Sequence, residues 1–171
     1  GDTDVDSHGA LPSIDIDEET LFSRELVPFM SLIESGVPAI MTGHISFPRI
    51  VPNGEPASLS KSFVTGILRE KLGYEGLVIT DDIMMRGAWQ YAGVVSNVVR
   101  LAIEAGNDIV ISSETAGLNE ALWRNNLQLM STDENFKSQV VKAAHRVIKS
   151  KLDYFKGDNP VPLYPDVSKV D

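Results

Sequence analysis

Three short apolar runs, each followed by a helical pattern, constrain the fold of this 171-residue chain most strongly. The runs are Pro38–Thr42, Leu77–Thr80 and Asp108–Ile111. Strands that are apolar throughout are typically buried on both faces, and their alternation with helices is typical of parallel βα units. Three strands cannot close a (β/α)8 barrel, which takes about 250 residues. The pattern therefore predicts an α/β fold, either as a small open sheet or as the last part of a barrel.

Five helical patterns surround these runs. They are expected around Asp17–Ile33, Ser60–Leu72, Gln90–Ala105, Thr115–Met130 and Asp133–Phe155. Pro28 should kink or interrupt the first helix, because proline lacks the N–H that the helical hydrogen bond needs. The polar residues 1–16 read as a loop, and the proline-containing residues 157–171 read as an extended tail.

Composition excludes several classes of function. The net charge of −9 and the pI near 4.8 argue against nucleic acid as a partner, because phosphate binding needs a concentrated positive surface. The chain has no cysteine, which excludes disulfides and thiolate chemistry but leaves the compartment open. No apolar run approaches the roughly 20 residues of a membrane span. No phosphate-binding glycine motif is present, so no nucleotide cofactor is expected.

Polar side chains follow each of the three apolar runs. His44 comes after the first, Asp81 and Asp82 after the second, and Ser112–Glu114 after the third. In parallel βα proteins the carboxyl ends of the strands open on one face, where function gathers. These side chains are therefore expected to lie on a common face.

Asp81 is the strongest candidate for chemistry, because it directly follows Leu77–Thr80 and would be held by a rigid strand. A carboxylate there could attack an anomeric carbon or stabilise an oxocarbenium ion. Alternatively, Asp81 or Asp82 caps the next helix or closes the turn. One of the two is expected to have a structural task.

Asp6 and His8 lie two residues apart in the first loop, so an extended backbone would point both side chains the same way. The carboxylate could then orient the imidazole for proton transfer. The other interpretation is a surface loop with an incidental histidine. His44 could bind a ligand or hold its own loop by hydrogen bonds. No close-spaced motif such as H-x-H joins the histidines and aspartates, so no metal site is predicted.

Several segments of the chain resemble one family in the same order. Residues 1–8, G-D-T-D-V-D-S-H, resemble the second half of the signature K-H-F-P-G-H-G-D-T-x-x-D-S-H of glycoside hydrolase family 3. That signature is distinctive of the family's β-N-acetylglucosaminidase branch. The further matching segments are Leu11-Pro12, Pro38–His44, Gly73–Ala88 and Ala105–Asp108. The resemblance covers residues 1–112 specifically and the terminal helices more loosely.

The resemblance implies a TIM-like (β/α)8 barrel in which the three runs are strands six to eight. Residues 1–156 would then form part of the barrel domain and residues 157–171 the tail. It also implies the retaining removal of terminal, non-reducing β-linked N-acetylglucosamine through a covalent glycosyl-enzyme. The implied nucleophile is Asp81 and the implied acid/base is His8 with Asp6 as its partner, in place of the usual two carboxylates.

The same resemblance carries expectations about context. The first half of the signature and five strands are absent from the chain, so we expect the rest of the barrel elsewhere, for example on another chain, and no activity from this part alone. The implied substrate is an N-acetylglucosamine glycoside or muropeptide, in the peptidoglycan recycling of a cytoplasmic or periplasmic bacterial enzyme. Two alternatives stay open: an N-acetylglucosaminide phosphorylase, since histidine does not repel phosphate as a carboxylate would, and a non-catalytic sugar-binding or assembly domain.

Overall fold

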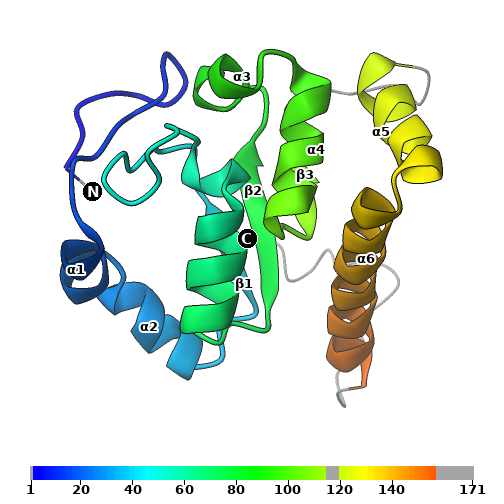
Figure 1. Ribbon diagram of the computed structural model, residues 1–171. Coiled ribbons are helices and arrows are strands. Elements are labelled where there is room, and N and C mark those ends of the chain that lie inside the picture. The colour runs from blue at the N-terminus through cyan, green and yellow to red at the C-terminus, as the bar shows by residue number, and fades with distance from the viewer. Residues whose placement is uncertain (1, 115–119, 157–171) are drawn as a thin grey trace, which may run out of the picture.

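A three-stranded parallel sheet forms the centre of the computed structural model, which describes residues 2–114 and 120–156 (Figure 1). The strands, in the spatial order β1-β2-β3, are β1 (Ala39–Thr42), β2 (Leu77–Asp82) and β3 (Ile109–Ile111). Both pairings are parallel, with Ile40 opposite Val78 and Ile79 opposite Ile109. The predicted α/β class with parallel βα units is confirmed.

Nine helical elements accompany the sheet in the part of the chain that the structure describes. They are α1 (Glu18–Thr20), η1 (Leu21–Glu25), α2 (Val27–Glu34), η2 (Ala57–Leu59), η3 (Ser62–Lys71), α3 (Arg86–Ala92), α4 (Val95–Ala105), α5 (Ala121–Thr132) and α6 (Glu134–Phe155). η1 and η3 are π-helices and η2 is a 3-10 turn. None of the helices in the described ranges is long and apolar enough to cross a membrane.

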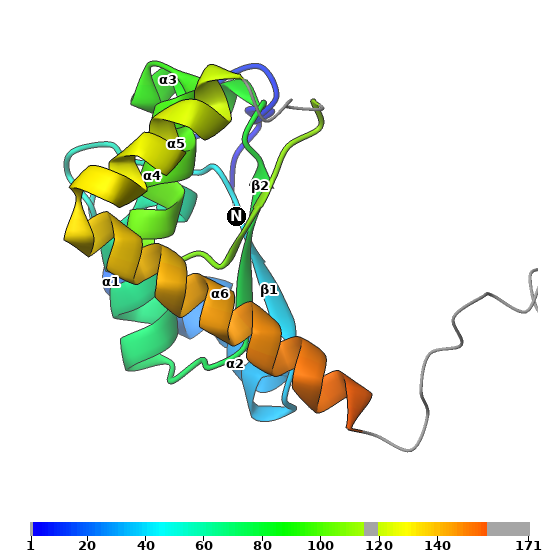
Figure 2. The same cartoon turned by 90° about the vertical axis from the view of Figure 1, so that its right-hand side faces the viewer.

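The sheet buries one face and leaves the other largely uncovered. Ile40 and Val78 point into a core beneath the helices, whereas Met41, the next residue of β1, is 54% exposed. Figure 2 shows α3, α4 and α5 together on one side of β2. The apolar runs predicted burial on both faces. That prediction is wrong for the described residues, because their helices cover a single face.

Glycine and proline divide two of the predicted helices. Pro28 lies in the first turn of α2, where its missing N–H costs nothing, so the first helix is interrupted before it as predicted. The helix expected over Gln90–Ala105 is instead two helices, because Gly93 adopts a φ of +80° between α3 and α4. Asp133 caps α6: its side chain accepts from the N–H groups of Asn135 and Phe136. Residues 115–119 of the predicted fourth helix, and the tail 157–171, lie outside the described residues.

Candidate active site

The carboxyl ends of the strands bring Asp81 and Asp82 to one edge of the sheet, as the βα pattern predicted. Both residues lie inside β2 rather than after it, so the strand itself holds them. The pairing of β2 with β3 is irregular between Ile79 and Asp82, and both carboxylates are partly exposed there. The Asp81 Oδ1 accepts a hydrogen bond of 2.8 Å from the Asp82 N–H.

Asp82 has the structural task of the pair. Its Oδ1 accepts backbone N–H bonds of 3.0 Å from both Met84 and Ser113, which closes the turn after β2 and ties it to the end of β3. Burial disfavours the charged form, but the hydrogen bonds from Ser113 and Met84 outweigh it and lower the pKa of Asp82. Asp82 is thus engaged by two backbone donors from other residues, whereas Asp81 accepts the bond from its neighbour; a reacting role for Asp81 stays a prediction.

Asp6 and His8 form a dyad in the first loop. The Asp6 Oδ1 accepts hydrogen bonds from the His8 backbone N–H at 3.0 Å and from the ring Nδ1 at 2.7 Å. With Nδ1 as donor, Nε2 is the ring nitrogen left for proton transfer, and both side chains are 76% exposed. The hydrogen bond and charge of Asp6 raise the pKa of His8, and the carboxylates of Asp81 and Asp82 act in the same direction.

His44 is buried at the same edge of the sheet, 1% exposed. Its Nε2 donates to the carbonyl oxygen of Asp82 at 3.1 Å, and its Nδ1 accepts from the Ser58 hydroxyl at 2.6 Å. Burial lowers the pKa of His44, which favours this neutral ring. Both ring nitrogens thus have protein partners, a geometry that favours the loop-holding interpretation. Direct substrate binding by His44 stays a prediction.

A buried amide behind these residues was missed from the sequence. Asn107 is fully buried, and its Nδ2 donates to the Ser58 carbonyl at 2.8 Å while its Oδ1 accepts from the Thr42 hydroxyl at 2.9 Å. It thereby links the end of β1 to the loop that holds His44. The available signal was a polar residue directly after Gly106, at the start of an apolar strand.

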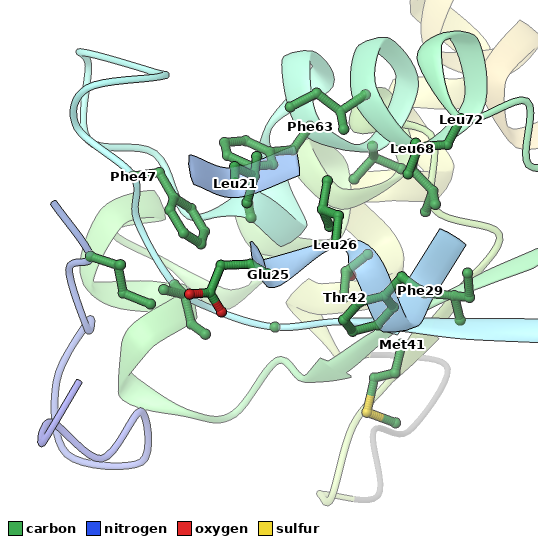
Figure 3. Close-up of a pocket in the computed structure, with 17 residues that line it drawn as sticks. Leu21, Glu25, Leu26, Phe29, Met41, Thr42, Phe47, Phe63, Leu68 and Leu72 are labelled. Atoms are coloured by element: carbon green, nitrogen blue, oxygen red, sulfur yellow. The ribbon is translucent and has the colours of Figure 1, made fainter. Parts of the chain in front are cut away.

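An apolar cavity of about 260 Å³ lies among η1, α2, η3 and β1. Figure 3 shows mostly hydrocarbon side chains around it, with the carboxylate of Glu25 as the charged group among those labelled. None of Asp6, His8 and Asp81 lines it. A sugar needs polar partners for its hydroxyls, so this cavity is not the candidate site.

Within residues 2–114 and 120–156, no group of three or more histidine, aspartate or glutamate side chains is placed to hold a metal ion. The arrangement described above instead offers a proton-transfer imidazole and a strand-held carboxylate. The model of the family described as Glycosyl hydrolase family 3 N terminal domain matches residues 1–150.

The chain belongs to glycosyl hydrolase family 3.

Relatives within family 3 carry consistent names. Beta-hexosaminidase A of Pseudoalteromonas piscicida is 35% identical over 65% of this chain, and a Beta-hexosaminidase of Methylobacillus flagellatus is 35% identical over 63%. A solved family 3 beta-N-acetylglucosaminidase from Paenibacillus sp. aligns with all of the chain at a TM-score of 0.78 and 32% identity. The chain spans 20%, 30% and 32% of these three proteins, respectively. The predicted resemblance is confirmed.

Proposed function

We propose that this chain carries the catalytic residues of a retaining β-N-acetylhexosaminidase that removes terminal, non-reducing β-linked N-acetylglucosamine. The single observation that carries the proposal is the Asp6–His8 hydrogen bond of 2.7 Å. Strand β2 holds Asp81, the proposed nucleophile. The names of the curated relatives, beta-hexosaminidase, support the same substrate class.

The proposed reaction has two steps. His8 first donates its Nε2 proton to the glycosidic oxygen while Asp81 attacks the anomeric carbon, so the aglycone leaves and a glycosyl–Asp81 ester forms. Neutral His8 then takes a proton from water, and that water attacks the anomeric carbon and breaks the ester. Two displacements restore the original configuration and leave His8 protonated and Asp81 ionised. Asp6 holds the imidazole in the tautomer that both steps require.

We further propose that β1, β2 and β3 are strands six to eight of a (β/α)8 barrel whose domain includes residues 1–156. Support comes from the sheet itself: its uncovered face carries Met41, which the lumen of a closed barrel would bury. A second reason is that the chain aligns over its whole length with the Paenibacillus enzyme but covers only 32% of that enzyme, as part of a larger domain would. As natural substrate we propose a muropeptide released in peptidoglycan recycling, on the ground of the family resemblance.

Replacing the nucleophile tests the function. In the whole polypeptide that carries these residues, Asp81→Ala should lower kcat on an aryl N-acetylglucosaminide by a factor on the order of 10³ or more. Asp15→Ala, an exposed carboxylate outside the site, is the matched control and should retain wild-type turnover. Mass spectrometry after denaturation should find the sugar on the peptide that contains Asp81. Near wild-type turnover of Asp81→Ala would refute the assignment.

The same assay separates the two alternatives. A rate that rises with inorganic phosphate, with N-acetylglucosamine 1-phosphate as product, would identify a phosphorylase. Calorimetric binding of N-acetylglucosamine by a wild-type protein that turns over no aryl glycoside would identify a sugar-binding domain.

A further inference from the structure

The loop that carries the Asp6–His8 dyad rests on the first turn of α3. Ser7, the residue between the two, accepts a hydrogen bond of 3.0 Å at its carbonyl oxygen from the Gly87 N–H. Figure 1 shows the N-terminal loop, drawn in blue, beside α3. Gly87 is the second residue of α3, where a helix provides no carbonyl partner for the N–H. The dyad loop itself therefore satisfies this donor.

Gly87 also allows three segments to approach closely. A Cβ atom at this position would lie 3.2 Å from the Ser7 carbonyl oxygen, 3.2 Å from the His44 Cβ and 3.3 Å from the His44 carbonyl oxygen. Contacts this short are tighter than ordinary van der Waals packing. Two of the neighbouring atoms belong to backbone, and the third is held by the buried His44 ring, so none can swing aside as the end of a flexible side chain would.

The position of Gly87 relative to Asp81 is set by a short, hydrogen-bonded turn. The Met84 N–H bonds the Asp82 carboxylate and the Met85 N–H bonds the Asp82 carbonyl oxygen, both at 3.0 Å. The His44 ring bonds that same carbonyl oxygen. The first turn of α3 is consequently fixed to the end of β2, where Asp81 lies.

We propose that Gly87 is a positioning residue for the acid/base. Its N–H and its missing side chain seat Ser7, and through Ser7 the dyad, at a fixed place relative to Asp81. The inference rests on the proposed function, since it assigns His8 the proton transfer. A methyl group at residue 87 lifts the loop and displaces His8, while Asp81 stays in its strand.

The experiment compares leaving groups in Gly87→Ala. The dinitrophenolate of a 2,4-dinitrophenyl N-acetylglucosaminide leaves without being protonated. The leaving group of an unactivated alkyl or methoxyphenyl glycoside must be protonated by the acid. Displacement of His8 should lower kcat/KM for the second class by about ten- to a hundredfold more than for the first. Azide should speed the variant's turnover of the dinitrophenyl substrate, because it attacks the anomeric carbon of the glycosyl–Asp81 ester without a general base and yields the glycosyl azide.

Gly66→Ala is the matched control, because a Cβ there meets only the Lys61 carbonyl oxygen, at 3.9 Å. Its kcat/KM for both substrate classes should equal that of the wild type. Equal losses on both substrates in Gly87→Ala, or no loss on either, would overturn the inference while leaving the proposed function intact. A wild-type protein that cleaves neither substrate would overturn both.

Hydrogen exchange tests the contact even if Gly87→Ala does not fold. In the wild-type protein the Gly87 N–H should exchange far more slowly than the N–H of Arg86, its neighbour in the first turn of α3. The reason is that the Ser7 carbonyl oxygen accepts the Gly87 N–H and not that of Arg86. Exchange of Gly87 as fast as that of Arg86 would show that the loop is not seated and would overturn the inference.

Discussion

At the scale of single residues, Asp81 and Asp82 show how identical neighbouring side chains acquire different tasks. Spacing predicted that one would be structural but left open which one, and the family resemblance implied Asp81 as the nucleophile. The choice depends on Ser113, which follows β3 and lies 31 residues further along the chain. Its N–H reaches Asp82, so the partner that decides the matter is distant in sequence and close only after the strands pair.

The dyad leads to a prediction about pH. Because Asp6 raises the pKa of His8, the protonated acid should persist above the ordinary value of 6.5, and kcat/KM should fall as pH rises through the higher value. Asp6→Asn removes the charge, so this alkaline limb should move to lower pH. The measurement is kcat/KM against pH for an unactivated substrate. Asp4→Asn, an exposed carboxylate in the same loop, is the control and should leave the limb in place.

His44 allows its two interpretations to be separated. His44→Ala leaves the buried Ser58 hydroxyl without its partner and removes one of the two hydrogen bonds that the Asp82 carbonyl oxygen accepts. This should lower the free energy of unfolding by about 1–3 kcal/mol. If His44 holds the loop, Ser58→Ala should produce a smaller change of the same kind, with kcat affected more than KM. A rise in KM confined to the His44 variant would instead indicate contact with the sugar.

At the scale of elements, local signals predicted the bounds of α2 but not the start of α3. Pro28 and Gly36 delimit α2 through backbone effects that act within a few residues. The start of α3 at Arg86 had no such signal: Met85 provides no side-chain cap, and the helix instead receives the Ser7 carbonyl from the far end of the chain. Elements that are completed by distant partners are hard to predict from local patterns.

Asp108 joins three elements at the opposite end of the strands. Its side chain is fully buried and accepts bonds from Arg69 in η3 at 2.7 Å, from Arg146 in α6 at 2.5 Å and from the Val78 N–H at 2.9 Å. Asp108→Ala leaves two part-buried guanidinium groups without their counter-charge. It should lower the free energy of unfolding, measured with urea, by about 3–5 kcal/mol. Asp153→Ala, which breaks an exposed pair with Lys149, is the control and should change stability little.

At the scale of the whole molecule, the uncovered face of the sheet and the two edge strands are the dominant features. β1 and β3 each pair on one side only within the described residues, and Met41 and Ile111 expose apolar surface on or beside that face. Unpaired strand edges and apolar patches promote association. Residues 1–171 produced alone should therefore self-associate, which light scattering would detect, and should not hydrolyse an aryl N-acetylglucosaminide. A stable, active monomer would contradict both the edge argument and the proposed barrel.

The sequence by itself determined the elements and the candidate chemistry: periodicity and turn residues specify parallel βα units, and residue types identify an imidazole–carboxylate pair and a carboxylate on a strand. Tertiary structure supplied the contacts that separate the tasks within that set. It gave Asp82 the structural task, buried His44 between Ser58 and a carbonyl oxygen, and seated the dyad loop on Gly87. The physical reason is range: propensities and caps act over a few residues, whereas hydrogen-bond partners and desolvation come from segments that only folding brings together.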